Sequence, residues 1–249
     1  MADIPGSRRV EHIMGLPIVL DIRDEEFDES AVDDMFSWLE WVDRTFSTYK
    51  DASEISRLSR GELALEDAHE DVRAVLARCE ELRTETAGFF DMSFGDGLDP
   101  SGLVKGWSID RAADLLQDAG IRNFAVNAGG DMRLSGRAVP EPLWRVGIQH
   151  PRERERVAAT FGLTDSAVAT SGTYARGEHV LNPHTGRSPA GVLSVTIIGP
   201  DLATADAYAT AAFAMGREGP AWTARLRGYD AMTILEDDTV MYTGGFPDA

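Results

Sequence analysis

The stretch VATSGTYARGEHVLNPHTGRSP, residues 168–189, carries the most information about how this chain folds and what it does. It holds Tyr174, Arg176 and His179 among small residues, and it continues into a turn of sequence NPHTG at residues 182–186. Tight turns require glycine, proline and asparagine. A hydrophobic core does not require two histidines, an arginine and several hydroxyl groups within one short segment. The stretch is therefore typical of a place where the chain meets a ligand.

The segments at both ends of this stretch indicate a sheet. Residues 167–170, at its start, and residues 193–198, after it, are short and lack the spacing of a helix, which is typical of strands. Further strands are predicted at residues 16–22, 124–127, 132–134, 144–149, 160–163, 231–235 and 240–242. Gly129 and Gly130 predict a hairpin between the second and third of these.

Helices are predicted where apolar residues recur at intervals of three or four. The predicted helices are residues 28–46, 68–86, 108–120, 204–215 and 221–226, with Ser53 as a cap for a short additional helix. Residues 88–105 are expected to be irregular. Strands and helices are mixed without strict alternation, which predicts an α+β fold with a mixed, largely antiparallel sheet core and flanking helices. We expect residues 1–249 to form a single domain, because no linker or repeat interrupts them.

The composition limits the possible partners. The chain has 42 acidic and 24 basic residues and a formal net charge of −18. This balance argues against nonspecific binding to nucleic acid or to anionic lipid, although net charge alone also serves solubility. It does not exclude a small phosphate-bearing ligand, which responds to nearby donors more than to net charge. The sequence carries no signal for an oligomeric state.

The sequence also bears on the compartment. Cys79 is the only cysteine, which excludes a disulfide within the chain and a cysteine-rich metal site. The best apolar run near the N-terminus, residues 13–22, is interrupted by Pro17 and Asp21. We therefore expect no signal peptide, no membrane insertion and a cytoplasmic protein.

A first group of candidate functional residues lies in DPSGLVKGW, residues 99–107. Gly102 and Gly106 let the backbone approach a ligand closely, and a helix that begins just beyond them offers free N–H groups to an anion. Lys105 adds a positive charge, and Asp99 is suited to a ribose hydroxyl or a polar ring edge. An ordinary loop-to-helix junction with a solvated lysine explains the segment equally well.

A second group lies in the alanine-rich helix predicted from residue 204. Asp206 and Thr210 are four residues apart and share one helix face. A buried carboxylate needs a partner, and a carboxylate with a hydroxyl and backbone carbonyls is typical of Mg²⁺ rather than Zn²⁺ ligation. Taken alone, the residues favour the simpler interpretation, an acid placed by the helix dipole and a threonine bonded to its own backbone.

Three weaker signals complete the set. Tyr49 lies in a polar loop, residues 46–58, where an aromatic ring could stack on a planar ligand. GFFD at residues 88–91 and GGD at residues 129–131 are the others. Taken singly, each segment has a purely structural explanation. Residues 46–58 would be a loop with an exposed tyrosine, residues 88–91 would bury two phenylalanines in the core, and residues 129–131 would form a hairpin turn.

In this order, the segments resemble the ApbE family of flavin transferases. The matching stretches are Met14-Gly15, FSTYKDASEISRLS at 46–59, GFFD at 88–91, DPSGLVKGWSIDRA at 99–112, NAGGDMRLSG at 127–136, WRVGIQHP at 144–151, VATSGTY at 168–174, HVLNPHTG at 179–186 and ADAYATAAFAMG at 205–216. The resemblance implies a Mg²⁺-dependent FAD:protein FMN transferase, which attaches FMN from FAD to a threonine or serine hydroxyl of a target protein and releases AMP. FAD is then a substrate, and Mg²⁺ is the metal.

The resemblance also implies roles for single residues. It implies flavin contacts at Met14, Tyr49, Phe89, Phe90, Asp91, Asp99, Lys105 and Leu181. It implies Mg²⁺ ligation by the Gly102 carbonyl, Asp206 and Thr210, and it makes His179 the candidate base. Ala209 stands where the family often has a second acid, and the segment between GFFD and DPSG is shorter than usual.

We expect Lys105 to neutralise charge as the bond to AMP breaks, and His179 to take the proton of the incoming hydroxyl. Tyr49 and Phe90 are expected to sandwich the flavin or the adenine. Two alternatives keep the site: an FAD pyrophosphatase, in which water replaces the target hydroxyl, and a flavin-binding carrier or sensor without turnover.

Overall fold

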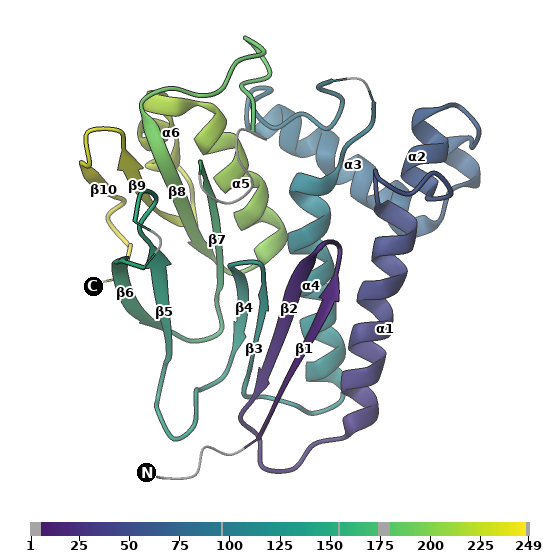
Figure 1. Ribbon diagram of the computed structural model, residues 1–249, viewed down its shortest axis with the longest axis vertical. Coiled ribbons are helices and arrows are strands. Elements are labelled where there is room, and N and C mark those ends of the chain that lie inside the picture. The colour runs from purple at the N-terminus through teal and green to yellow at the C-terminus, as the bar shows by residue number, and fades with distance from the viewer. Residues whose placement is uncertain (1–5, 96, 154, 174–179, 248–249) are drawn as a thin grey trace.

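The computed structural model describes residues 6–95, 97–153, 155–173 and 180–247, and its centre is one large sheet (Figure 1). The sheet has eight strands in the order β1-β2-β3-β4-β7-β8-β9-β10 among the described residues, and every neighbouring pair is antiparallel. The predicted α+β fold with a largely antiparallel sheet and flanking helices is confirmed.

The strands are short and follow the predicted positions closely. Their bounds are β1 Ser7–Ile13, β2 Leu16–Ile22, β3 Phe124–Ala128, β4 Asp131–Ser135, β5 Trp144–Gln149, β6 Val157–Leu163, β7 Ala167–Gly172, β8 Val192–Gly199, β9 Asp230–Leu235 and β10 Val240–Tyr242. The predicted hairpin between β3 and β4 is confirmed, with Gly129 at φ 64° and Gly130 at φ 110°. Two positive φ angles in a two-residue turn favour glycine and fix the register, so that Asp131 begins β4.

Three of the helices begin directly after an aspartate or serine whose side chain caps them. The helix bounds are α1 Glu29–Phe46, α2 Glu54–Ser59, α3 Glu70–Glu85, α4 Ser101–Asp118, α5 Leu202–Ala214 and α6 Gly219–Thr223, with 3₁₀ turns at Leu65–Asp67 and Gly216–Glu218. The caps of α1, α2 and α5 are Asp28, Ser53 and Asp201, whose side chains accept backbone N–H hydrogen bonds at the first turn of each helix. None of the helices in the described ranges is long and apolar enough to cross a membrane.

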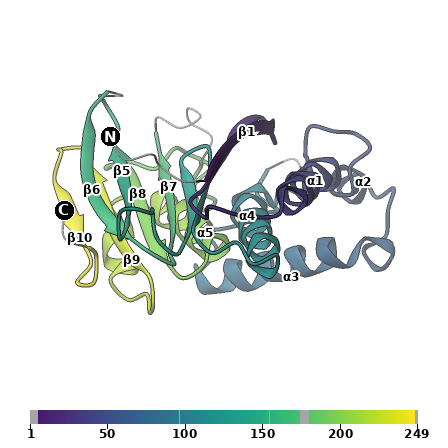
Figure 2. The ribbon, with the colours of Figure 1, turned by 90° about the horizontal axis from the view of Figure 1, so that it is seen from below.

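The elements form layers around three apolar cores (Figure 2). One core lies between the sheet and the helices α1, α4 and α5, and a second lies among α1, α3, α4 and α5. The small β5–β6 ribbon contributes Trp144, Val146 and Phe161 to a third core with residues of β4, β7, β8 and β9. Cys79 is fully buried in the second core, as the apolar spacing of its helix predicts.

Helices α4 and α5 pack closely enough to require a glycine. A Cβ atom at Gly106 would lie 2.7 Å from the carbonyl carbon of Leu202 and 2.8 Å from Cα of Ala203, distances that real Cβ atoms essentially never show. The Asp110 carboxylate of α4 also accepts hydrogen bonds from the Leu202 and Ala203 N–H groups at 2.8–2.9 Å. The expectation that Gly106 lets the backbone approach a ligand is therefore wrong, because its open face is filled by α5.

Two predictions about element bounds are also wrong. The third helix was expected from residue 108 and residues 88–105 were expected to be irregular, but α4 begins at Ser101. Glycine lowers helix propensity by about 1 kcal/mol per residue, which suggested a loop around Gly102, but packing against α5 overrides that preference. Strand β1 was not predicted, because its side chains are mostly polar and exposed at the sheet edge.

Candidate active site

A cavity of about 1040 Å³ opens where several segments distant in the sequence meet. It is lined by the β1–β2 turn, the C-terminal end of α1 and the loop after it, the segment before α4, the first turns of α4, the β3–β4 turn, β7, residues 180–183 and α5. The β1–β2 turn, the end of α1 and the start of α4 all lie at the upper ends of their elements in the view of Figure 1. The cavity is therefore a shared site of the whole chain and not a feature of one motif.

The structure brings together the site residues named from the sequence. The cavity is lined by Met14, Tyr49, Phe89, Phe90, Asp91, Asp99, Gly102, Lys105, Leu181, Asp206 and Thr210. His179, together with Tyr174 and Arg176, lies outside the described residues.

Three charged side chains form the inner wall of this cavity. Lys105 Nζ is ion-paired with Asp131 Oδ2 and lies 3.3 Å from Asp206 Oδ1. The carboxylate side chains are only 4% and 5% exposed, whereas the Lys105 side chain is 30% exposed. Asp131 Oδ1 also accepts a hydrogen bond from the Thr170 N–H at 2.9 Å, which ties β4 to β7. The cluster thus joins α4, α5, β4 and β7 at one point.

Burial and mutual attraction shift the pKa values of Asp206 and Lys105. Burial raises the pKa of Asp206 to about 7, with the positive charge of Lys105 opposing the shift and the negative charge of Asp131 adding to it. Burial lowers the pKa of Lys105, but the attraction of Asp206 and Asp131 outweighs burial and the net shift is upward. Lys105 is therefore a permanent cation facing two buried acids.

The Asp206 carboxylate is suited to a metal ion. Among the described residues, Asp206 Oδ2 is buried without a hydrogen-bond partner, and a buried polar atom without a partner is costly. Thr210 lies one helical turn further along α5, its Oγ1 3.4 Å from Ser171 Oγ, and Gly102 lines the same cavity from the first turn of α4. These groups offer only oxygen atoms, which fits Mg²⁺.

A zinc-type site is not formed by the part of the chain that the structure describes, since it contains no cluster of three or more histidine, cysteine, aspartate or glutamate side chains able to hold a metal.

The aromatic side chains of the cavity differ sharply in exposure. Phe90 is 4% exposed and packs against Gly102, where a Cβ atom would lie 3.0 Å from the ring. Tyr49 is 94% exposed at the rim. The expected sandwich of a ligand ring between Tyr49 and Phe90 stays a prediction, since Phe90 lines the cavity but exposes little of its surface. Phe94, which lines the cavity and is 37% exposed, is an accessible ring that the sequence interpretation missed.

The turn at residues 182–186 is confirmed, and its histidine has a structural role. The Gly186 N–H donates to the Asn182 carbonyl at 2.8 Å, and Gly186 has φ 68°. His184 Nε2 lies 3.1 Å from the Ala87 carbonyl, and its ring packs edge-on against Phe89 at 4.6 Å. His184 therefore fixes this turn against the segment that contributes Phe89 to the cavity.

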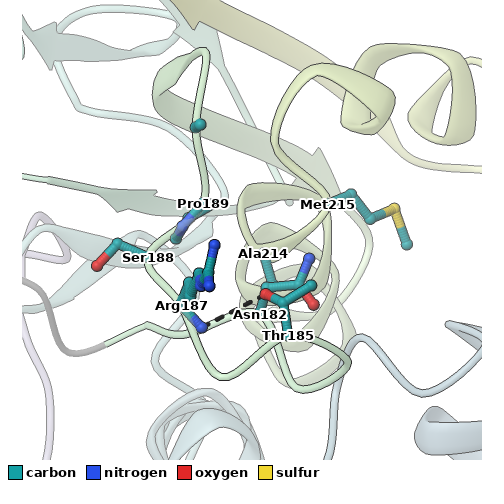
Figure 3. A pocket seen from close by; sticks show the side chains of 8 residues that line it. Asn182, Thr185, Arg187, Ser188, Pro189, Ala214 and Met215 are labelled. Atoms are coloured by element: carbon teal, nitrogen blue, oxygen red, sulfur yellow. Dashed lines mark hydrogen bonds between the residues drawn. The ribbon is translucent and has the colours of Figure 1, made fainter.

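A second hollow, of about 480 Å³, is lined in part by the same turn (Figure 3). Its lining side chains come from residues 182–190 and the C-terminal end of α5, with the Asn182–Arg187 backbone bridge at its base. Arg187 is exposed.

Asp131 is the main site residue that sequence reasoning missed. The GGD motif was interpreted as a hairpin turn, which is correct for the two glycines. The available signal was an acidic residue at the first position of a strand, where alternation makes it point into the protein. Asp131 is 3% exposed, and an acid so deeply buried requires a charged partner.

Comparison with known proteins identifies the relatives of this chain. A model of the ApbE family matches residues 14–97 and 95–233. The FAD:protein FMN transferase of Vibrio cholerae is 35% identical over 151 residues, which cover 57% of this chain and 45% of that protein. The FAD:protein FMN transferase of Rhodobacter capsulatus is 33% identical over 170 residues, which cover 60% of this chain and 32% of that protein. The match therefore spans less than half the length of these relatives.

Solved structures show the same fold. The flavin transferase ApbE from Vibrio cholerae superimposes with a TM-score of 0.84 at 23% identity, over 96% of this chain and 97% of that chain. The ApbE protein from Thermotoga maritima superimposes with a TM-score of 0.83 at 21% identity, again over 96% and 97%.

Proposed function

Because this chain belongs to the ApbE family, we propose that it is a Mg²⁺-dependent FAD:protein FMN transferase. The reaction moves the FMN part of FAD onto a threonine or serine hydroxyl of a target protein and releases AMP. One observation carries the proposal: in a cavity of about 1040 Å³, Asp206 lies buried beside Lys105 with one carboxylate oxygen unpaired among the described residues.

Asp206, Thr210 and the Gly102 carbonyl are the residues that would hold Mg²⁺. When bound there, Mg²⁺ supplies charge stabilisation for the diphosphate oxygens. Lys105 reaches the cavity with its ammonium group and neutralises negative charge on the leaving AMP phosphate. The target oxygen forms a bond to the FMN phosphorus while the bond from that phosphorus to the AMP oxygen breaks.

We assign the proton transfer to His179. The hydroxyl of the target must lose its proton as it attacks, and a histidine has an ordinary pKa near neutrality. The assignment of His179 rests on its place in the family motif HVLNPHTG and not on geometry, since it lies outside the described residues.

The rim residues are suited to hold the flavin and the ribityl or ribose hydroxyls. Tyr49 and Phe94 expose ring faces at the mouth of the cavity. Asp91 and Asp99 each accept a backbone N–H two residues further on, at 2.9 and 3.0 Å, which fixes one carboxylate oxygen and leaves the other for a ligand hydroxyl. Met14 and Leu181 supply apolar contacts.

The test is to incubate the purified chain with FAD and Mg²⁺, with and without a threonine-bearing target, and to follow AMP and covalent flavin together. We expect AMP release that depends on the target and equals the flavin attached. Asp206→Ala should abolish both, whereas Asp33→Asn, on the outer face of α1, should leave both unchanged. AMP release of equal rate without a target would indicate an FAD pyrophosphatase instead. Stable FAD with no AMP would indicate a flavin carrier.

A further inference from the structure

Asp131 has no part in the reaction as described, yet it is among the most deeply buried charged groups of the cavity. Its side chain is 4% exposed and forms the closer of the two ion pairs made by Lys105. Lys105 is one cation shared by two carboxylates, so the cluster of Lys105, Asp131 and Asp206 has a formal charge of −1. A buried cluster with an unbalanced negative charge favours a cation.

The geometry of the cluster divides the two acids into different roles. Asp131 is held by the Thr170 N–H through Oδ1 and faces Lys105 with Oδ2. Neither Asp131 Oδ2 nor Asp206 Oδ2 has a hydrogen-bond partner among the described residues. Asp131 Oδ2 is ion-paired with Lys105, whereas Asp206 meets Lys105 through Oδ1, at 3.3 Å, and its Oδ2 has no ion pair with any described residue. Lys105 is therefore ion-paired with both acids, and its ammonium group lies closer to the carboxylate of β4 than to that of α5.

We propose that Asp131 is a positioning residue that engages Lys105 and thereby keeps Asp206 available to a divalent cation. The inference rests on the proposed function, because it takes Asp206 as the acid that binds Mg²⁺. Without Asp131, Lys105 would neutralise Asp206 and compete with the metal for it. Asp131 thus sets the affinity of the site for Mg²⁺ without touching the metal.

This arrangement gives opposite expectations for two single substitutions. Asp131→Asn keeps an oxygen for the Thr170 N–H but leaves Lys105 and Asp206 as a neutral pair, so Mg²⁺ binding should weaken by about 10- to 100-fold, the usual effect of removing a residue that supports a metal ligand. Lys105→Met leaves two carboxylates without a counter-charge, so Mg²⁺ binding should tighten, by about tenfold on the same scale.

The double variant separates charge balance from structural support. Asp131→Asn combined with Lys105→Met returns the cluster to a charge of −1, carried by Asp206 alone. Its Mg²⁺ affinity should recover to within about threefold of the wild-type value, a strongly non-additive result that indicates direct coupling. If Asp131 only supported the fold, the two substitutions would each lower the Mg²⁺ affinity, and the double variant would show the sum of the two losses.

The experiment is calorimetric titration of Mg²⁺ into the four proteins in the absence of FAD, in one buffer at one pH. The unfolding temperature without metal is measured in parallel. It should not fall in Asp131→Asn, because the substitution leaves a balanced ion pair. Asp33→Asn is the matched control, since Asp33 is also ion-paired, with Arg9, but is exposed and lies outside the cavity.

The outcomes distinguish this inference from the proposed function. If the wild-type chain binds no Mg²⁺, the metal assignment and the role of Asp131 are both overturned. If the wild type binds Mg²⁺ and Asp131→Asn binds it equally well, only the role of Asp131 is overturned. A double variant that binds no better than Asp131→Asn also overturns that role.

Discussion

The contact between α4 and α5 gives the sharpest prediction about how the fold positions the site. Lys105 projects from α4 and Asp206 from α5, and Gly106 is the residue that lets these helices approach. A Cβ atom at Gly106 would lie 2.7 and 2.8 Å from backbone atoms of residues 202 and 203. Backbone cannot rotate away as a side chain can, so Gly106→Ala must move one helix.

The cost of this substitution can be worked out from two opposing effects. Forcing an extra methyl group into a packed interior costs up to about 3 kcal/mol, and the upper end applies because hydrogen bonds to Asp110 hold residues 202 and 203 in place. Alanine is favoured over glycine within a helix by about 1 kcal/mol. The net loss is about 2 kcal/mol, or about 4–8 °C in unfolding temperature for a chain of this size.

The assay is thermal and denaturant unfolding of Gly106→Ala, with Mg²⁺ affinity measured on the same protein. The matched control is Gly147→Ala in β5, where a Cβ atom would make only an ordinary contact of 3.6 Å with Val157. We expect the control to unfold within a few degrees of the wild type, and Gly106→Ala to lose both stability and Mg²⁺ binding. A Gly106→Ala protein as stable as the control would refute the close approach of the two helices.

Three further substitutions test other parts of the account. Burial raises the pKa of Asp110 to about 6, above its ordinary value of 3.8, so the folded state holds a proton more tightly than the unfolded state. The free energy of unfolding of the wild type, relative to that of Asp110→Asn, should therefore fall as the pH rises from about 4 to about 6. Denaturant titrations of both proteins at several pH values measure this difference. A difference that does not change with pH would contradict the raised pKa of Asp110. Tyr49→Ala should weaken FAD binding by about 1–3 kcal/mol without altering the unfolding temperature, whereas Tyr49→Phe keeps the ring and should bind normally in the same fluorescence titration. His184→Ala removes the contacts to Ala87 and Phe89, so it should lower the free energy of unfolding by about 1 kcal/mol and raise KM for FAD; an unchanged KM would show that the turn does not shape the cavity.

Local signals in the sequence were sufficient for most of the fold. The start of α1 follows from its apolar spacing after Asp28, and the β3–β4 hairpin follows from two glycines. Helix α5 was predicted from residue 204 but begins two residues earlier, after the capping side chain of Asp201. The start of α4 could not be predicted in the same way. Its two glycines lower helix propensity locally, and only the contact with α5 explains why the helix tolerates them and why Gly106 is required.

In the site too, the sequence predicted pairs of residues that are close along one helix, but not pairs that only tertiary packing brings together. Asp206 and Thr210 could be paired from the sequence, because four residues place two side chains on one helix face. The partner of Lys105 could not, since Asp131 reaches it only through the packing of β4 against α4 and α5. The stacking role of Phe90 stays a prediction from its residue type, and only the structure shows that its buried ring also packs against Gly102.

The most direct test of the central claim is the mass spectrum of a threonine-bearing target after incubation with this chain, FAD and Mg²⁺. The account predicts that the target gains the mass of one FMN for every AMP released, and that neither product forms with Asp206→Ala. An unlabelled target, with FMN and AMP free in solution or with FAD intact, would contradict it.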